Sequence, residues 1–349
     1  MLDLLLKGGL VVDGTGSPAK LSDIGILDGR IVAIGEIDES ASEVIDASDL
    51  VVTPGFVDPH THYDAQLFWD PAAASSSKHG VTSVMAGNCG FTLAPIDAKD
   101  ADYTRRMMAK VEGMPLAALE SGVPWNWSTF GEYLDRLDGN IGVNAGFLVG
   151  HCALRRNVMG DEAVGNEASP SQLAEMISKL NDSIKAGGMG FSTTLSFTHS
   201  DGDGEPVASR WASRDEILAL CRAVSAHEGT TLEYVTDGCL RGFSDDEIDL
   251  MAEMSLAARR PLNWNVLTID SAEPERYREQ LSALEHAASR GGRSVALTMP
   301  ILVEMNMSFG THCALFMLPD WSEVMSLPVP QRIEKLRDPQ VRAHLLARS

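Results

Sequence analysis

The 349-residue sequence predicts an α/β protein, in which a small β layer precedes a parallel sheet covered by helices. Apolar runs in residues 1–53 are short and are separated by Asp-Gly pairs at 13–14 and 28–29, which is typical of strands joined by turns. From residue 51 onward, strand-like runs alternate with helical segments, and this alternation favours a parallel sheet. We therefore expect a β segment over residues 1–53 and a second domain over residues 54–349.

Seven segments of the chain are predicted to be parallel strands. Each is an apolar run, and each is followed by a loop or helical segment. No eighth strand-like run follows, because residues 300–312 are loop-like and a charged, helix-like tail covers residues 330–349. The seven predicted strands are residues 50–57, 81–88, 141–149, 189–195, 231–235, 262–267 and 295–299.

The helices between these strands have recognisable ends. Ser213 and Ser244 are each followed three residues later by a glutamate, which is the pattern of a capping box. Another helix is expected after Ser169, with a proline in its first turn and its end at the glycines 187–188. We expect the helix that begins after Ser213 to end at Gly229.

Two histidines, His60 and His62, stand at the end of the first predicted strand. In an extended chain residues i and i+2 point to the same side, so the two imidazoles can converge on one point. Cys89 follows the second predicted strand, and a thiolate with two neutral imidazoles is a donor set that suits zinc. An isolated cysteine is more often a small buried apolar residue. The joint position of the three residues at successive strand ends favours a metal site.

Several motifs in the first 195 residues together carry a resemblance to a known family. They are two glycine-containing β segments at 3–16 and 28–35, Gly-Phe-Val-Asp-Pro-His-Thr-His at 55–62, Gly-Asn-Cys-Gly at 87–90 and Gly-Met-Gly-Phe-Ser-Thr-Thr-Leu at 188–195. These motifs resemble the metal-dependent amidohydrolase superfamily, in its N-acyl-D-amino-acid deacylase branch. The resemblance implies a (β/α)8 barrel of the TIM type with a β-sandwich segment at its amino end, here with seven visible strands and therefore incomplete. It also implies one or two zinc ions and hydrolysis of a linear amide bond in an N-acyl-D-amino acid.

The resemblance also assigns metal ligands, and the sequence departs from it at two strand ends. Cys89 matches the cysteine that bridges the metals or binds one tightly in this branch. Histidine ligands are implied at the ends of the fifth and sixth strands, and neither is present. Glu233 in the fifth strand is the best substitute because a carboxylate can bind zinc; pairing with Arg241 is the alternative. The aspartate implied near the last strand is not visible in this chain, which leaves the catalytic base unassigned.

Four polar residues at strand ends are candidate substrate contacts, because the carboxyl ends of barrel strands face the active site. His151 follows the third strand and Ser192 ends the fourth, and each has a structural alternative as a hydrogen-bonding residue inside the fold. Asn263 and Asn265 share one face of the sixth strand and can offer amide hydrogen bonds to a substrate carbonyl or carboxylate.

Charge and composition limit the partners of the chain. The net charge of −21 repels phosphate backbones and argues against nucleic acid. No apolar run approaches the roughly 18 residues of a membrane-spanning helix. Five cysteines without paired spacing and the lack of a signal-like first segment predict a cytoplasmic protein. A small N-acyl amino acid or related amide is the expected substrate, and unpaired barrel edges predict association into a homo-oligomer.

Two other functions are alternatives to the deacylase. A cyclic-amide hydrolase of the hydantoinase or dihydroorotase kind generally uses a lysine ligand at the fourth strand end, and residues 188–209 contain no lysine. A catalytically inactive, truncated barrel that only assembles with other chains is the remaining hypothesis. Zinc content separates that hypothesis from both enzymes.

Overall fold

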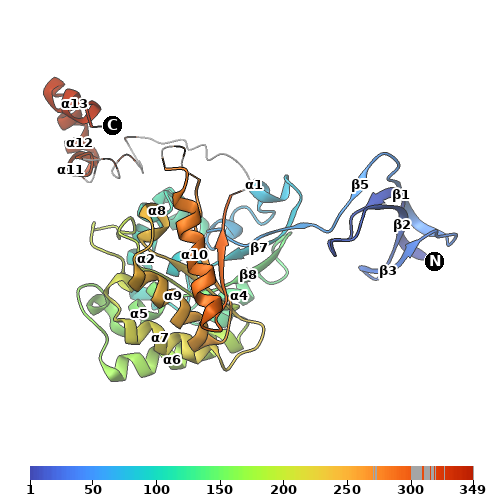
Figure 1. Ribbon diagram of the computed structural model, residues 1–349, viewed down its shortest axis with the longest axis horizontal. Coiled ribbons are helices and arrows are strands. Elements are labelled where there is room, and N and C mark those ends of the chain that lie inside the picture. Colours follow the sequence, from blue (N-terminus) through green and yellow to red (C-terminus); the bar gives the residue numbers. More distant parts are fainter. Residues whose placement is uncertain are drawn as a thin grey trace. The chain divides into compact units, whose positions relative to one another are not determined.

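The computed structural model describes residues 1–269, 271, 273–299, 309, 315, 318, 320–325 and 327–348 (Figure 1). The chain divides into two compact units. Unit 1 contains Met1–Val57 and His79–Thr82, and unit 2 contains Asp58–Lys78 and Ser83–Ser349.

The N-terminal β layer is a five-stranded sheet built around its first strand. β1 is antiparallel to β2 and parallel to β4 and β5, and β3 pairs with β2 in the antiparallel sense. The predicted N-terminal β segment is thus confirmed. The strands are β1 (Leu2–Val11), β2 (Lys20–Leu27), β3 (Arg30–Gly35), β4 (Ala41–Asp46) and β5 (Val51–Val52).

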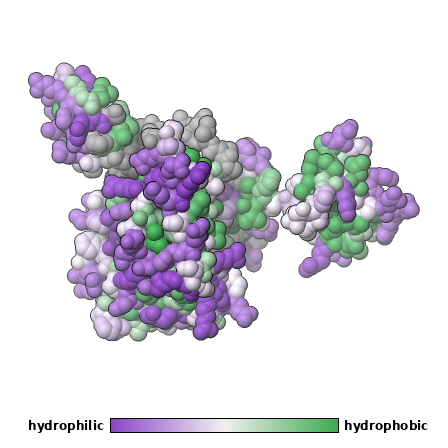
Figure 2. Space-filling view, in the orientation of Figure 1, coloured by the Kyte–Doolittle hydropathy of each residue, from purple (hydrophilic) through white to green (hydrophobic). Residues whose placement is uncertain are grey.

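This sheet buries little apolar surface. Leu2, Leu5 and Ile24 are buried in its small core. Ile31 on β3 and Val44 on β4 are more than half exposed, and Figure 2 shows apolar patches on this unit. The strands are apolar enough to form the sheet, but the described residues leave part of its apolar surface in contact with solvent.

Six of the seven predicted parallel strands are confirmed, and the first, residues 50–57, is corrected: β5 pairs with β1 in the N-terminal sheet, whereas β6 pairs with β7. The third predicted strand is split at Leu148 into β8, which pairs with β7, and β9, which pairs with β10, so it connects a three-stranded and a five-stranded sheet. No eighth parallel strand occurs among the described residues, and most of 300–319 lies outside them. The strands are β6 (Phe56–Asp58), β7 (Val81–Ala86), β8 (Asn144–Phe147), β9 (Val149–Gly150), β10 (Gly190–Thr194), β11 (Thr231–Val235), β12 (Leu262–Asn265) and β13 (Ser294–Leu297).

Helices cover the parallel strands in chain order. α5 contacts α6, α6 contacts α7, α7 contacts α9 and α9 contacts α10, as expected for a strand-helix repeat (Figure 1). Among the described helices, none combines the length and the apolar character needed to cross a membrane. The helices of this part are α1 (Ala74–Ser77), α2 (Ala101–Val111), α3 (Leu116–Gly122), α4 (Phe130–Leu137), α5 (His151–Met159), α6 (Pro170–Lys185), α7 (Arg214–Val224), α8 (Gly238–Arg241), α9 (Asp245–Ala258) and α10 (Arg276–Ser289).

The predicted helix ends are mostly confirmed, with two corrections at α7. Ser169 and Ser244 form complete capping boxes, and Ser213 accepts a hydrogen bond from the Glu216 backbone N–H. The Glu216 side chain does not complete a box, because it turns inward to buried partners. The helix also ends at Val224 rather than at Gly229.

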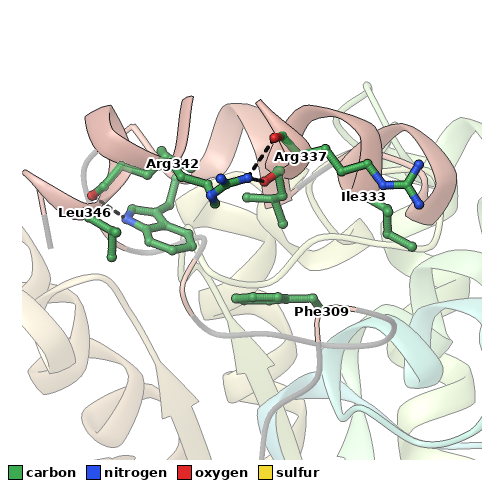
Figure 3. A pocket seen from close by; sticks show the side chains of 8 residues that line it. Phe309, Ile333, Arg337, Arg342 and Leu346 are labelled. Carbon is green, nitrogen blue, oxygen red and sulfur yellow. Dashed lines mark hydrogen bonds between the residues drawn. The ribbon is translucent and has the colours of Figure 1, made fainter. Parts of the chain in front are cut away.

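Three further helices form a small cluster near the carboxyl end. α11 (Ser322–Met325), α12 (Val329–Arg337) and α13 (Pro339–Leu346) confirm the predicted helical tail. α12 and α13, together with Trp321 and Phe309, line an apolar pocket of about 450 Å³, in which the Phe309 ring faces the helices and Arg342 donates to the Leu336 and Arg337 carbonyls (Figure 3). None of its lining residues is a predicted site residue.

Candidate metal centre

The loop after β6 carries the two histidines and is tied to the end of β7. The Thr61 backbone N–H donates to the Met85 carbonyl at 2.8 Å, and the Thr61 hydroxyl donates to the same oxygen at 2.9 Å. His60 and His62 flank this anchor, and their rings meet edge to face with 5.2 Å between centroids. The spacing of the two histidines therefore does bring their imidazoles to one place.

Cys89 lies in a tight turn after β7. φ is +75° at Gly87, +55° at Cys89 and +78° at Gly90, so the turn passes through the left-handed region three times. A Cβ at Gly87 would stand 2.3 Å from the Leu148 carbonyl oxygen, so this position requires glycine. Cys89 holds this conformation despite its side chain, and backbone strain of this kind clusters at functional sites.

The sulfur and the two imidazoles form a compact donor group. Cys89 Sγ lies 3.6 Å from His60 Nε2 and 3.7 Å from His62 Nε2, and the three donor atoms lie within 4.8 Å of one another. Two donors at about 2.3 Å (sulfur) and about 2.05 Å (nitrogen) from one tetrahedral zinc ion would be about 3.6 Å apart. The residues present therefore fit zinc in both donor type and spacing.

The electrostatics of the group also suit a cation. Burial, with His62 adding to it, lowers the pKa of His60 to about 3, and burial lowers the pKa of His62 to about 4. Both imidazoles are therefore neutral at neutral pH, which is the form that binds metal. Burial raises the pKa of the Cys89 thiol well above its usual range, with Glu233 and Glu112 adding to it. A bound cation would replace the thiol proton.

Glu233 on β11 lies directly beneath Cys89. Its Oε2 accepts a hydrogen bond from the Cys89 backbone N–H at 2.7 Å, and its Oε1 is buried without a hydrogen-bond partner in the described part of the chain. Burial raises the pKa of Glu233 to about 8, against hydrogen bonds from Cys89 and Asn265 that lower it. Glu233 is outside the three-atom donor group. Arg241 instead stacks on the Phe197 ring, 3.9 Å from its centroid.

The two asparagines of β12 occupy successive levels of the same face. Asn263 is in register with Glu233 on the neighbouring strand. Asn265 lies two residues further along β12 and directs Nδ2 toward Cys89 Sγ at 3.9 Å. Both Oδ1 atoms are buried without hydrogen-bond partners among the described residues. Asn265 therefore borders the donor group and Asn263 lies below it.

Ser192 and His151 are buried and use their polar atoms inside the protein. The Ser192 hydroxyl accepts from the Gly90 N–H and donates to the Gly87 carbonyl, so it supports the Cys89 turn from below. His151 hydrogen-bonds Thr193 through Nδ1 and Glu216 through Nε2, both at 2.8 Å. This geometry favours the structural alternative for both residues, and substrate contact by either stays a prediction.

Sequence reasoning missed two groups beside the donors. Glu112, at the end of α2, places Oε1 3.6 Å from His62 Nε2, and burial raises its pKa to about 8. His199, in the loop after β10, hydrogen-bonds Thr194 at 2.8 Å, and burial, followed by nearby His62, lowers its pKa to about 3. Neither residue stands at a strand end. The available signal was that His199 follows a parallel strand, on the side where barrel sites are built, and that Glu112 lies at the end of the helix between β7 and β8.

Comparison with known proteins agrees with the geometry of the centre. The D-aminoacylase of Alcaligenes xylosoxydans xylosoxydans is 35% identical over 237 residues, or 67% of this chain and 44% of the relative. The N-acyl-D-aspartate deacylase of the same organism is 34% identical over 259 residues, or 74% and 47%. A solved N-acyl-D-glutamate deacylase from Bordetella bronchiseptica, in complex with zinc and a phosphonate inhibitor, has a TM-score of 0.67 and 26% identity over 86% of this chain and 59% of that one.

The chain spans about half the length of the curated relatives that it matches. The sequence pattern of the Amidohydrolase family matches residues 43–349, which is most of the chain and includes the whole donor group. The predicted superfamily and its D-aminoacylase branch are thereby confirmed. This chain belongs to the Amidohydrolase family.

Proposed function

We propose that this chain is a zinc-dependent amidohydrolase that hydrolyses the linear amide bond of N-acyl-D-amino acids. The observation that carries the proposal is the convergence of Cys89 Sγ, His60 Nε2 and His62 Nε2 within 4.8 Å at the ends of two adjacent strands. The similarity to D-aminoacylase and to N-acyl-D-aspartate deacylase supports the choice of a linear N-acyl substrate.

His60, His62 and Cys89 would hold the ion, and Glu233 would join them through Oε1. The Glu233 assignment is supported by that oxygen, which is buried and has no hydrogen-bond partner in the described structure. When bound, zinc polarises an amide carbonyl and makes water a better nucleophile at neutral pH. One or two ions fit the proposal, and Cys89 would contribute its sulfur in either case.

The chain's own polar groups would bind and orient the substrate. Asn265, beside the donor group, is placed to offer an amide N–H to a substrate carbonyl or carboxylate, and Asn263 is placed one level below it. Ser192 would influence substrate binding indirectly, by supporting the Cys89 turn, and His151 would do so through its hydrogen bond to Thr193. The product would be a carboxylate and a free D-amino acid.

We also propose a cytoplasmic location, supported by cysteines that are free and buried at 89, 152, 221 and 239. Self-association into a homo-oligomer is supported by the exposed apolar side chains of the N-terminal sheet, such as Ile31 and Val44.

The test is a substrate panel on the purified, zinc-loaded protein. Amine release from N-acetyl-D-amino acids with apolar and acidic side chains, and from the matching L compounds, is measured beside the formation of an N-carbamoyl amino acid from a hydantoin. The proposal expects turnover of at least one D compound, with little from its L partner. Faster opening of the hydantoin ring would favour the cyclic-amide hydrolase, and the absence of turnover with zinc bound would contradict both enzymes.

A further inference from the structure

We propose that Arg210 binds the α-carboxylate of the N-acyl amino acid and so selects an anionic substrate over a neutral amide. The inference rests on the proposed function and assigns the side chain that recognises the charged end of the substrate. An N-acyl amino acid carries its carboxylate one carbon away from the amide nitrogen. A site that holds this amide must therefore accommodate a negative charge close to the metal centre.

Arg210 is in the 3-10 helix η5 (Ala208–Trp211), a short turn held against the end of β10. Ser209 in the same turn is buried, and its hydroxyl donates to the Thr194 carbonyl at 2.9 Å. Thr194 is the last residue of β10. Because the carboxyl ends of barrel strands face the active site, this bond keeps Arg210 on the functional side of the sheet.

His199 links Arg210 to the donor group. Arg210 Nη1 donates to the His199 carbonyl at 3.3 Å. The His199 ring packs edge to face on the Phe91 ring with 5.0 Å between centroids, and the Phe91 ring centroid lies 6.3 Å from that of His62. Burial lowers the pKa of His199, with His62 and then Arg210 adding to it. Arg210 is therefore close enough to the metal centre to act on the same imidazole as His62.

The charge of Arg210 is not neutralised by an ion pair among the described residues. Its one side-chain hydrogen bond in this part of the chain goes to a backbone carbonyl. Asp237 raises its pKa, but the carboxylate of Asp237 accepts from the Phe197 N–H, and burial outweighs its effect on the arginine. The side chain is only partly buried, so its other N–H groups can be reached. A planar guanidinium with unused N–H groups can bind a carboxylate through two hydrogen bonds.

Two other arginines that follow barrel strands are already engaged. Arg155 is buried against the Glu216 carboxylate, and Arg241 stacks on the Phe197 ring. The carboxyl groups beside the donor group offer no positive charge to a substrate anion. These groups are Asp64, Glu112 and Glu233. Arg210 therefore supplies the positive charge that an anionic substrate needs at this site.

The test compares each N-acetyl-D-amino acid of the substrate panel with its α-carboxamide, which has a similar shape but no α-charge. Acetate release gives kcat and KM for both compounds in the wild type, in Arg210→Gln and in Arg222→Gln, a matched change at an exposed arginine of α7. We expect Arg210→Gln to raise the KM for the acid about 10- to 100-fold. Its kcat for the acid and its KM for the carboxamide should stay unchanged, because the lost contact is the same before and during the reaction.

Two further variants complete the comparison. Arg210→Lys keeps the charge but loses the planar fork, so its KM for the acid should fall between those of the wild type and Arg210→Gln. Arg222→Gln should match the wild type with both compounds. Circular dichroism shows whether each variant is folded, and Arg210→Lys serves in place of Arg210→Gln if the latter is not.

Three kinetic results would overturn the assignment. An equal rise in KM for the acid and the carboxamide would show that Arg210 shapes the site without recognising the charge. An unchanged KM for the acid, with or without a fall in kcat, would remove Arg210 from substrate binding. A wild-type protein that uses the carboxamide as well as the acid would show that the α-carboxylate is not recognised.

Binding separates this inference from the proposed function. Calorimetry on the zinc-loaded protein gives Kd for the acid and for the carboxamide without any need for turnover. Tighter binding of the acid by the wild type, lost in Arg210→Gln, would support Arg210 even if no amide were hydrolysed, and only the proposed function would then fail. Equal binding of the two compounds by the wild type, or no binding of either, would contradict the role of Arg210.

Discussion

At Cys89, burial favours the protonated thiol, whereas metal binding requires the thiolate. The thiol is buried beside two neutral imidazoles and two carboxylates, and its pKa is raised because burial disfavours the thiolate. A cation reverses this preference, because it binds the thiolate and releases the proton. Zinc binding should therefore weaken as the pH falls, because protons then compete with zinc for the thiolate and for both imidazoles.

A substitution at Glu233 tests whether this residue is a zinc ligand. If Oε1 is a zinc ligand, Glu233→Gln should weaken zinc binding about 10-fold or more, because the amide keeps the size of the side chain but loses its charge. The measurement is competition with a chelator, with circular dichroism to show that the fold is intact. Equal zinc affinity in the two proteins would leave Glu233 with the structural role that its bond to the Cys89 N–H already shows.

Among the elements, the turn at residues 87–90 depends strongly on one residue, Gly87. Gly87→Ala would place a methyl group 2.3 Å from the Leu148 carbonyl oxygen and would force alanine to φ +75°. Gly139→Ala is the matched control, because φ there is +70° and no atom lies within 4 Å of the new Cβ. We expect Gly87→Ala to lower the free energy of unfolding by roughly 1–3 kcal/mol more than the control. Equal losses in urea denaturation would show that the turn relaxes around the methyl group.

The elements that the sequence predicted well are those with local signals. Apolar runs bounded by glycine or charge placed six of the seven predicted strands, and serine caps placed the starts of α6, α7 and α9. The run at 50–57 was taken as one strand, but its first part pairs in the N-terminal sheet and its last part in the parallel sheet. The capping pattern at Ser213 was half wrong because Glu216 pairs with Arg155, whose position in the sequence gives no hint of the contact. Glu112 was missed for the same reason, since its approach to His62 depends on how α2 packs.

For the whole molecule, a buried ionic network joins α5, α7 and β10. The Glu216 carboxylate accepts from Arg155 Nη1 at 2.6 Å and from His151 Nε2 at 2.8 Å, and His151 Nδ1 bonds Thr193. Burial by itself raises the pKa of Glu216, but these partners outweigh burial and hold it at about 2, against 4.5 for a free glutamate. The network therefore favours the folded state wherever the unfolded chain would be ionised at this position.

This network predicts an acid dependence of stability. Because the folded pKa of Glu216 is lowered, its contribution to stability is complete above pH 4.5 and is lost as the pH falls toward 2. Glu216→Gln should therefore be less stable than the wild type at pH 7, and the difference should shrink on acidification. The exposed Glu228→Gln is the control and should track the wild type. A difference between Glu216→Gln and wild type that stays constant from pH 7 to pH 3 in urea denaturation would contradict the linkage.

Zinc content tests the central claim most directly, and the chain supplies its own control. Cys89 and Cys221 are both free, buried cysteines, but only Cys89 belongs to the donor group. Mass spectrometry of the purified proteins should find one or two zinc ions in the wild type and in Cys221→Ala, and clearly less in Cys89→Ala, His60→Ala and His62→Ala. Equal zinc in all five proteins, or none in the wild type after zinc is supplied, would contradict a metal centre at these three residues.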